Sequence, residues 1–147
     1  MLLDAIKVSD IQIKKEAKDW KEAIRTASVP LLESEKIASS YVDAMINVVD
    51  EKGPYIVITK HIALAHARPE TGVLEKGLSF TTLNNPVPFG SQQFDPVKLI
   101  ITLAATDSES HLDLLSELAD VLTDGDITEK LFEAKNEQEF LELLQSV

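Results

Sequence analysis

Residues 98–105 (KLIITLAA) give the strongest strand signal in this chain, because they are apolar for most of their length. Residues 55–58 (YIVI) are also continuously apolar. A strand with one face in water alternates apolar and polar side chains, whereas an uninterrupted apolar strand is buried on both faces. These two segments therefore predict a sheet that lies between two layers of helices.

Start and stop residues mark helices that could form these layers. Asp19 opens a capping-box pattern (DWKE) before a helix expected over residues 20–32, and Pro30 should disturb the last turn of this helix or end it early. A second helix is expected over residues 34–49 and should stop at Gly53. Three further capping boxes predict helices in the last third of the chain: Thr106-x-x-Glu109, Asp126-x-x-Glu129 and Asn136-x-x-Glu139.

Shorter segments complete the predicted sheet. Further strands are expected over residues 11–13, 62–64 and 78–83. A turn is expected at residues 84–86 (NNP), where a long irregular stretch begins that runs to residue 95 and could border a site. Gly125 should end the helix that Thr106 opens.

The order of these elements is a strand, two helices, several strands and then helices. This order predicts the α/β class, with residues 1–147 forming a single three-layer α/β/α domain whose mixed sheet is covered by helices on both faces. No repeat, low-complexity segment or linker divides the chain.

Composition excludes several classes of function. The formal net charge of −11 and the pI near 4.6 argue against nucleic acid and anionic membranes as partners, although the acidity can equally serve solubility alone. The absence of cysteine excludes disulfides and thiolate chemistry and fits a reducing cytoplasm. No apolar run approaches the ~20 residues that cross a bilayer, and the N-terminus lacks the pattern of a secretory signal. We therefore expect a cytoplasmic protein without direct membrane insertion.

Against this acidic background, residues 53–94 are almost free of carboxylates. Only Glu70 and Glu75, out of 25 acidic residues, fall in this window. Two of the three histidines, His61 and His66, also lie there, followed by Arg68. Such a segment can hold an anion that the rest of the chain would repel.

His66 is the candidate nucleophile. It follows Ile62 and Leu64 at a spacing of two and shares their face of a regular strand, whereas His61 should point to the opposite face. One nitrogen of a neutral imidazole can attack a phosphoryl group and later release it, provided that the other nitrogen donates to a fixed acceptor. The sequence does not name this acceptor, and a half-buried histidine with a structural hydrogen bond is the simpler alternative.

His111 and Arg68 are candidates for stabilising the transferred group. His111 lies in about the first turn of the helix that Thr106 should open, where the helix dipole favours an anion and disfavours a protonated imidazole. Arg68 can bind phosphate oxygens or attract an acidic partner, and both residues could instead be ordinary exposed side chains. A zinc site of the histidines with Glu109 fits less well, because HxxxxH on a strand separates its two rings, so neither metal nor cofactor is expected.

These motifs resemble the IIA component of the phosphoenolpyruvate-dependent sugar phosphotransferase system, in the mannitol/fructose superfamily and most of all its L-ascorbate type. The resemblance covers nearly the whole chain and rests on residues 53–58 (GPYIVI), 62–73 (IALAHARPETGV), 95–105 (DPVKLIITLAA) and 110–112 (SHL). It implies that the carrier protein HPr phosphorylates His66 on Nε2, with His111 as the second active-site histidine. A IIB protein would then accept the group on a cysteine, ahead of sugar uptake through a membrane IIC protein.

One position departs from the family's pattern, because the residue before the active histidine is usually proline and is Ala65 here. This departure supports an alternative function, a non-catalytic regulatory module of the same fold that senses phosphorylation state. We adopt the phosphocarrier, in which His66 accepts the group, His111 stabilises it and Arg68 assists transfer or docking. Weak docking of successive partners would suit an apolar rim around the nucleophile, for which the candidates are Ala63, Leu64, Val73 and Phe89.

Overall fold

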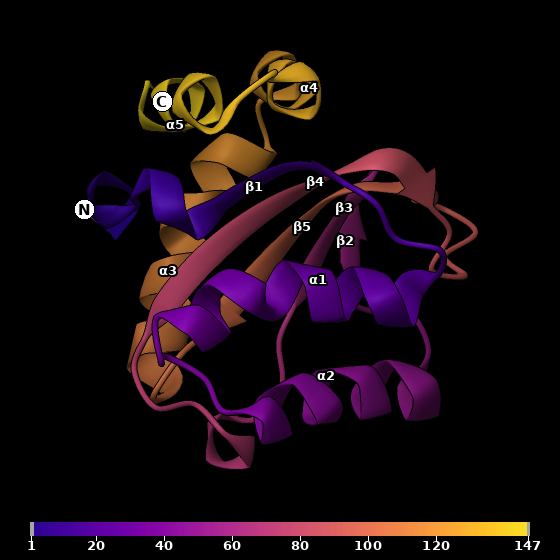
Figure 1. Ribbon diagram of the computed structural model, residues 1–147, viewed down its shortest axis with the longest axis vertical. Helices are drawn as coiled ribbons and strands as arrows, with labels where there is room; N and C mark the ends of the chain where they lie inside the picture. The colour runs from indigo at the N-terminus through magenta and orange to yellow at the C-terminus, as the bar shows by residue number, and fades with distance from the viewer. Residues whose placement is uncertain (1, 147) are drawn as a thin grey trace.

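The computed structural model describes residues 2–146, apart from the side chains of Leu2, Ser108 and Ser110. A mixed five-stranded sheet lies between two layers of helices, as predicted (Figure 1). The strands are β1 (Ile11–Lys15), β2 (Val57–Thr59), β3 (Ile62–Ala65), β4 (Gly77–Val87) and β5 (Val97–Ala104). The α-helices are α1 (Trp20–Glu33), α2 (Ser39–Lys52), α3 (Ser108–Leu122), α4 (Gly125–Glu133) and α5 (Glu137–Gln145). The short 3-10 helices are η1 (Leu2–Ala5), η2 (Val8–Asp10) and η3 (Pro69–Thr71).

The strand order β1-β4-β5-β3-β2 places β3 beside β5 in parallel, from Ile62 opposite Leu99 to Ala65 opposite Thr102. Both strands therefore end at the same edge of the sheet, which we call the carboxyl edge, and both begin at the opposite, amino edge. β4 is antiparallel to β5, so the segment 88–96 that joins them lies at the amino edge. This arrangement decides which loops and helices can meet.

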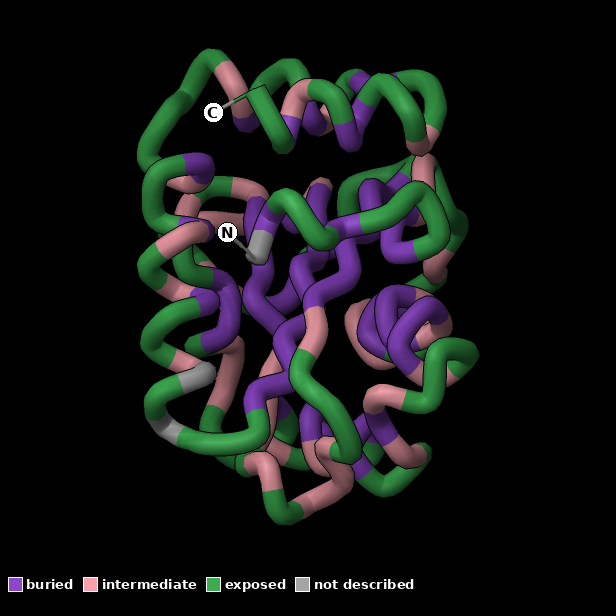
Figure 2. The backbone as a smooth tube through the Cα atoms, turned by 90° about the vertical axis from the view of Figure 1, so that its left-hand side faces the viewer, coloured by how far each residue is buried: buried purple, intermediate pink, exposed green. Residues whose placement is uncertain are grey.

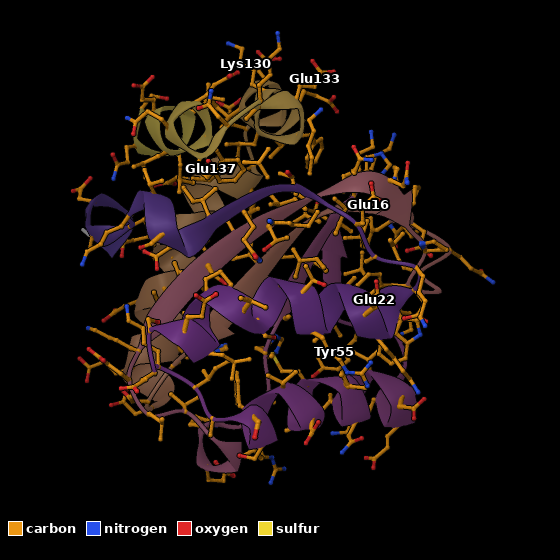
Figure 3. The ribbon with its side chains drawn as sticks, viewed as in Figure 1. Glu16, Glu22, Tyr55, Lys130, Glu133 and Glu137 are labelled. Carbon is orange, nitrogen blue, oxygen red and sulfur yellow. The ribbon has the colours of Figure 1, made fainter. Side chains whose placement is uncertain are left out.

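Each face of the sheet has its own apolar core. The side chains of Ala63 and Ala65 pack with α1 and α2, whereas those of Ile62 and Leu64 pack with α3, α4 and α5. The strands accordingly form the buried centre of the molecule, between helices with exposed outer faces (Figure 2). On α4, for example, the charged side chains of Lys130 and Glu133 point away from the sheet (Figure 3).

Helix α1 continues through Pro30 to Glu33, one residue beyond the predicted end, so Pro30 does not end the helix early. Proline has no N–H to donate to the carbonyl four residues earlier, which belongs to Thr26. The side chain of Gln12 on β1 supplies the missing donor, with its Nε2 at 2.7 Å from that carbonyl. The same Nε2 lies 2.9 Å from the hydroxyl of Thr81 on β4. A neighbouring strand thus satisfies the carbonyl, and the helix continues.

Helix α2 begins at Ser39 rather than at residue 34. Glu35 has a positive φ of 61°, and the N–H of Lys36 returns to the carbonyl of Leu31 at 2.9 Å. These features end α1, and they involve residues that were predicted to begin the second helix. The predicted stop is confirmed, because Gly53 caps α2 with a φ of 88°.

Residues 55–58 are not a strand buried on both faces. The strand β2 begins only at Val57 and lies at the edge of the sheet, while Tyr55 and Ile58 are 47% and 38% exposed. The predicted turn at residues 84–86 is also wrong, because β4 continues to Val87 with a shift in register opposite β5. A bulge near the end of a strand accommodates a proline without reversing the chain.

Of the three helix starts predicted in the last third of the chain, two lie at other residues and one is confirmed. α3 begins at Ser108, which places Thr106 before the capping position. Gly125 opens α4 rather than ending α3, and the cap is Asp124, whose carboxylate accepts from two backbone N–H groups at 3.0 and 3.1 Å. Asn136 caps α5 as predicted, accepting from Glu139 N–H at 2.8 Å. Within residues 2–146, no helix has both the length and the apolar composition that crossing a bilayer requires.

Candidate functional site at the carboxyl edge

The carboxyl edge brings together two of the predicted site residues. His66 directly follows β3, and His111 lies on α3, which follows the neighbouring strand β5. Their ring centroids are 5.8 Å apart, with an angle of 57° between the ring planes. Both side chains are partly exposed, so a group bound between them would be reachable from solvent. Adjacent parallel strands thus place two imidazoles 45 positions apart in the chain in one site.

The backbone fixes the protonation pattern of His66. Its Nδ1 lies 2.8 Å from the carbonyl oxygen of Leu64, two residues earlier. A carbonyl can only accept a hydrogen bond, so this contact assigns the proton to Nδ1. In the neutral ring, Nε2 then keeps its lone pair. The acceptor that a nucleophilic His66 needs, and that the sequence could not name, is therefore the Leu64 carbonyl.

The electrostatic surroundings of His111 favour its neutral form. Partial burial lowers the pKa of His111, and a positive charge on the nearby His66 ring would lower it further. The position of His111 near the start of α3 acts in the same direction, since the positive end of the helix dipole disfavours a cation. The backbone N–H of His111 donates to the Asp107 carbonyl at 3.1 Å. A neutral His111 can still donate one hydrogen bond from its ring.

Arg68 lies two residues beyond His66 with an exposed side chain, and its backbone begins η3. The surroundings of the site are less free of carboxylates than residues 53–94 suggested. Asp107 lines a surface hollow together with Pro69, His111 and Leu112. The carboxylate-poor window covers one wall of the site, and Asp107, directly before α3, places a carboxylate on the other wall.

Apolar side chains do flank the two histidines, but the rim was mostly predicted at the wrong residues. Ala63, Leu64 and Phe89 are core residues with 0%, 3% and 5% exposure. The exposed apolar side chains are Tyr55, whose ring meets that of His66 edge-on at 5.8 Å, and Leu112, which follows His111 and is 65% exposed.

Val73 is the one residue of the predicted rim that reaches the surface near the site. It is partly exposed and lines a hollow with Pro69, Glu70, Thr106 and Asp107. The sequence did not indicate Tyr55 as a rim residue, because its exposure depends on β2 being an edge strand.

His61 lies at the amino edge, at the other end of β3. The prediction that His61 points to the opposite face from His66 is wrong. Its φ of 70° takes it out of the strand, and its ring packs edge-on against Phe132 of α4 at 6.1 Å. Its N–H donates to the carbonyl of Phe94, so the segment 84–95 also lies at this edge and does not border the His66 site. Among the described residues, no group of three histidine, aspartate or glutamate side chains converges in a way that could hold a metal ion.

Comparison with known proteins gives a consistent result over the whole chain. Residues 4–147 match the family model described as "Phosphoenolpyruvate-dependent sugar phosphotransferase system, EIIA 2". The mannitol-specific cryptic phosphotransferase enzyme IIA component of Escherichia coli (strain K12) is 35% identical over 97% of both chains. The ascorbate-specific EIIA component of the same strain is 33% identical, over 91% of this chain and 88% of its own.

A solved structure matches the fold and includes a partner. It is the complex of the mannitol enzyme IIA with phosphorylated enzyme IIB from Escherichia coli, with a TM-score of 0.84 and 28% identity, covering 97% of this chain and 98% of the other. The similarity therefore extends from sequence to three-dimensional structure along nearly the full length. The chain belongs to the EIIA 2 family of the phosphoenolpyruvate-dependent sugar phosphotransferase system, and it is a phosphotransfer protein of that system.

Proposed function

We propose that this protein carries a phosphoryl group on Nε2 of His66, between the donor HPr and the cysteine of a IIB protein. The observation that carries this proposal is the hydrogen bond from His66 Nδ1 to the Leu64 carbonyl at 2.8 Å, which leaves Nε2 as the nucleophile. The neighbouring His111 ring, 5.8 Å away between centroids, is the second group of the site. Without the fixed proton on Nδ1, either nitrogen could react and the geometry of transfer would be undefined.

Each step exchanges one bond to phosphorus for another. The bond between phosphorus and the donor imidazole of HPr breaks as a bond to His66 Nε2 forms. In the second step this bond breaks as phosphorus binds the thiolate sulfur of the IIB cysteine. No electron transfer is involved, and the proton on Nδ1 stays hydrogen-bonded to Leu64, where the carbonyl stabilises the positive charge that the ring gains.

His111 and Arg68 would assist by binding the oxygens of the group in transit. Phosphoryl transfer depends mainly on positioning and on stabilising charge on the equatorial oxygens. The ring N–H of a neutral His111 can donate to one oxygen, and the α3 dipole favours negative charge nearby. Arg68 is exposed, so it would steer an acidic partner surface or contact the phosphoryl group after docking.

The partners and setting follow from the family. Two exposed apolar side chains, Tyr55 and Leu112, lie beside the two histidines and would contact HPr and IIB in turn. Residues 1–147 would form one cytoplasmic IIA type-2 domain, and a membrane IIC protein would take up the sugar. The resemblance of the motifs and the ascorbate-specific relative both favour an ascorbate-like substrate.

The direct test is to incubate the purified protein with phosphoenolpyruvate, enzyme I and HPr and to measure its mass. We expect one added phosphoryl group that is labile in acid and stable in alkali, mapped to the peptide containing His66. Adding a IIB protein should then remove the label. A label on a different residue would refute the assignment.

The regulatory alternative rests on Ala65, which stands where the family usually has proline. It predicts that His66 is phosphorylated but that no IIB protein accepts the group. A IIB panel that includes ascorbate-type and mannitol-type proteins separates the two functions. Transfer to the ascorbate-type protein alone would also support the substrate assignment.

A further inference from the structure

A buried tyrosine from α2 reaches the carboxyl edge beneath the two histidines. Tyr41 is only 1% exposed, yet its hydroxyl makes two good hydrogen bonds to backbone groups. It donates to the carbonyl of Leu103 at 2.6 Å and accepts from the N–H of Ala67 at 3.1 Å. The carbonyl of Ala67 lies farther away, at 3.4 Å, and the single hydroxyl proton is already directed to Leu103.

These two bonds join the segments that carry the site. Ala67 directly follows His66, and Leu103 is at the end of β5, whose continuation leads into α3 and His111. One oxygen atom therefore connects the backbone beside His66 to the strand that leads to His111. We infer that Tyr41 is a positioning residue, which holds His66 at its working distance from His111 without contacting the transferred group.

Other contacts from the start of α2 fix the far end of the same segment. The N–H of Ala38 donates to the carbonyl of Gly72 at 2.8 Å, and the hydroxyl of Ser40 donates to the carbonyl of Thr71 at 2.7 Å. Gly72 has a φ of 150°, and a Cβ atom there would lie 2.8 Å from the Tyr41 nitrogen, so the backbones touch. The Tyr41 hydroxyl is thus the attachment nearest to His66, on a segment that α2 holds at both ends.

Chemistry restricts Tyr41 to this role. Burial raises the pKa of Tyr41 to about 12, so the hydroxyl stays neutral at physiological pH and does not exchange its proton during transfer. Replacing it with phenylalanine would keep the ring in the core but leave the partly buried Ala67 N–H and the buried Leu103 carbonyl without this partner. A buried backbone group without a partner drives local rearrangement, because its desolvation is no longer compensated.

The kinetic test compares Tyr41→Phe with Ser28→Ala. Ser28 is fully buried, and its hydroxyl bonds within α1 to the Ile24 carbonyl at 2.7 Å, so this variant also loses one buried hydroxyl. The test rests on the proposed function, with HPr as donor. We expect Tyr41→Phe to lower kcat for phosphorylation about tenfold, since misplacement of reacting groups slows a step that depends on orientation. KM for HPr should not change, because the exposed docking side chains remain, and Ser28→Ala should keep the wild-type kcat.

A second measurement needs no phosphodonor, so it separates failure of this inference from failure of the proposed function. Burial is the main cause of the lowered pKa of His111, and the charge of His66 is the second cause. Imidazole titration by NMR should show this pKa rising part of the way toward its ordinary value in Tyr41→Phe, because moving the two rings apart removes the second cause. As a control, the NMR chemical shifts of the His61 ring, at the amino edge, should be the same in both proteins at a given pH.

Hydrogen exchange of the wild-type Ala67 amide covers the case in which Tyr41→Phe does not fold. Slow exchange is expected if the tyrosine oxygen holds this N–H, and fast exchange would overturn the inference. Wild-type kcat in a folded Tyr41→Phe protein, or an equal loss in Ser28→Ala, would also overturn it. Absence of wild-type phosphorylation together with the expected His111 shift would refute the proposed function alone.

Discussion

The two ends of β3 each hold a histidine ring in the same way. At the carboxyl edge, His66 Nδ1 lies 2.8 Å from the Leu64 carbonyl and the ring meets Tyr55 edge-on. At the amino edge, His61 Nδ1 lies 2.7 Å from the carbonyl of Pro96 and the ring meets Phe132 edge-on. Both neutral rings therefore keep the lone pair on Nε2.

The difference between the two ends lies in what surrounds that nitrogen. Only the carboxyl edge adds a second imidazole, the start of a long helix and exposed apolar side chains beside the ring. His61 instead packs against Phe132 of α4, a ring that the Nζ of Lys98 also approaches, at 5.5 Å from its centroid. A fixed tautomer therefore does not distinguish the two histidines, and we expect the surroundings of the ring to decide which of them can accept a phosphoryl group.

The largest effect should separate the two ends completely. His66→Ala should take up no phosphate from HPr, whereas His61→Ala should be labelled at the wild-type rate, because only the first variant lacks the nucleophile. His61→Ala should lose about 1 kcal/mol of stability with its hydrogen bond to Pro96. Mass spectrometry measures the label and urea unfolding the stability. Label retained by His66→Ala, or lost from a folded His61→Ala, would break the comparison.

His111→Ala tests whether the second imidazole makes the carboxyl edge functional. Transfer to and from His66 should slow about 100-fold, which is typical for loss of one donor that stabilises charge in the transition state. The fold should persist because the side chain is partly exposed. Rapid-quench labelling gives the rate and circular dichroism verifies the helices. Wild-type rates in this variant would show that the second imidazole does not account for the difference between the two ends of β3.

Arg68 tests the contribution of charge at the carboxyl edge. Arg68→Gln should slow labelling by HPr about tenfold at low salt, and Arg68→Lys should retain much of the rate, since steering depends on charge more than on geometry. The loss should shrink as salt is added, because screening weakens steering in the wild type as well. A rate that falls equally at all salt concentrations would instead indicate direct contact with the phosphoryl group.

The smallest effect concerns the pH dependence of stability. The pKa of His111 is lowered from 6.5, mainly by burial, so the unfolded chain binds more protons at this position than the folded one. This contribution to stability is present above pH 6.5, the pKa of His111 in the unfolded chain, and is lost as the pH falls through the lowered pKa of the folded state. Urea midpoints of wild type and His111→Gln, measured from pH 8 to pH 5, should therefore converge toward acidic pH. Parallel curves would show that the site does not disfavour the charged ring.

Local sequence signals predicted most of the layers. The apolar run at residues 98–105 indicated the central strand, and Asp19 and Asn136 marked two helix starts that the structure confirms. Some errors were local, such as the positive φ of Glu35 before α2 and the cap of α4 at Asp124 rather than Asp126. Another arose where a residue outside the segment decides the outcome. Pro30 does not end α1, because the side chain of Gln12 on strand β1 donates to the Thr26 carbonyl that the proline leaves without a partner. No local pattern contains that information.

Family resemblance pointed to His66 and His111 as candidates for the site, but it did not give their geometry. The parallel pairing of β3 with β5 explains why the two rings lie close together. The acceptor for His66 is a backbone carbonyl, which has no sequence signature. No sequence signal marked Tyr41 as part of the site, because its hydroxyl partners belong to segments 26 and 62 residues away along the chain.

The segment 88–96 lies at the amino edge, at the far end of β3 and β5 from the two histidines. Its tip, near Gln92 and Gln93, is exposed. A fluorescent label or an affinity tag attached there would lie at the opposite end of the sheet from the proposed docking surface. The protein could therefore be labelled or immobilised for assays of the proposed transfer without blocking the carboxyl edge.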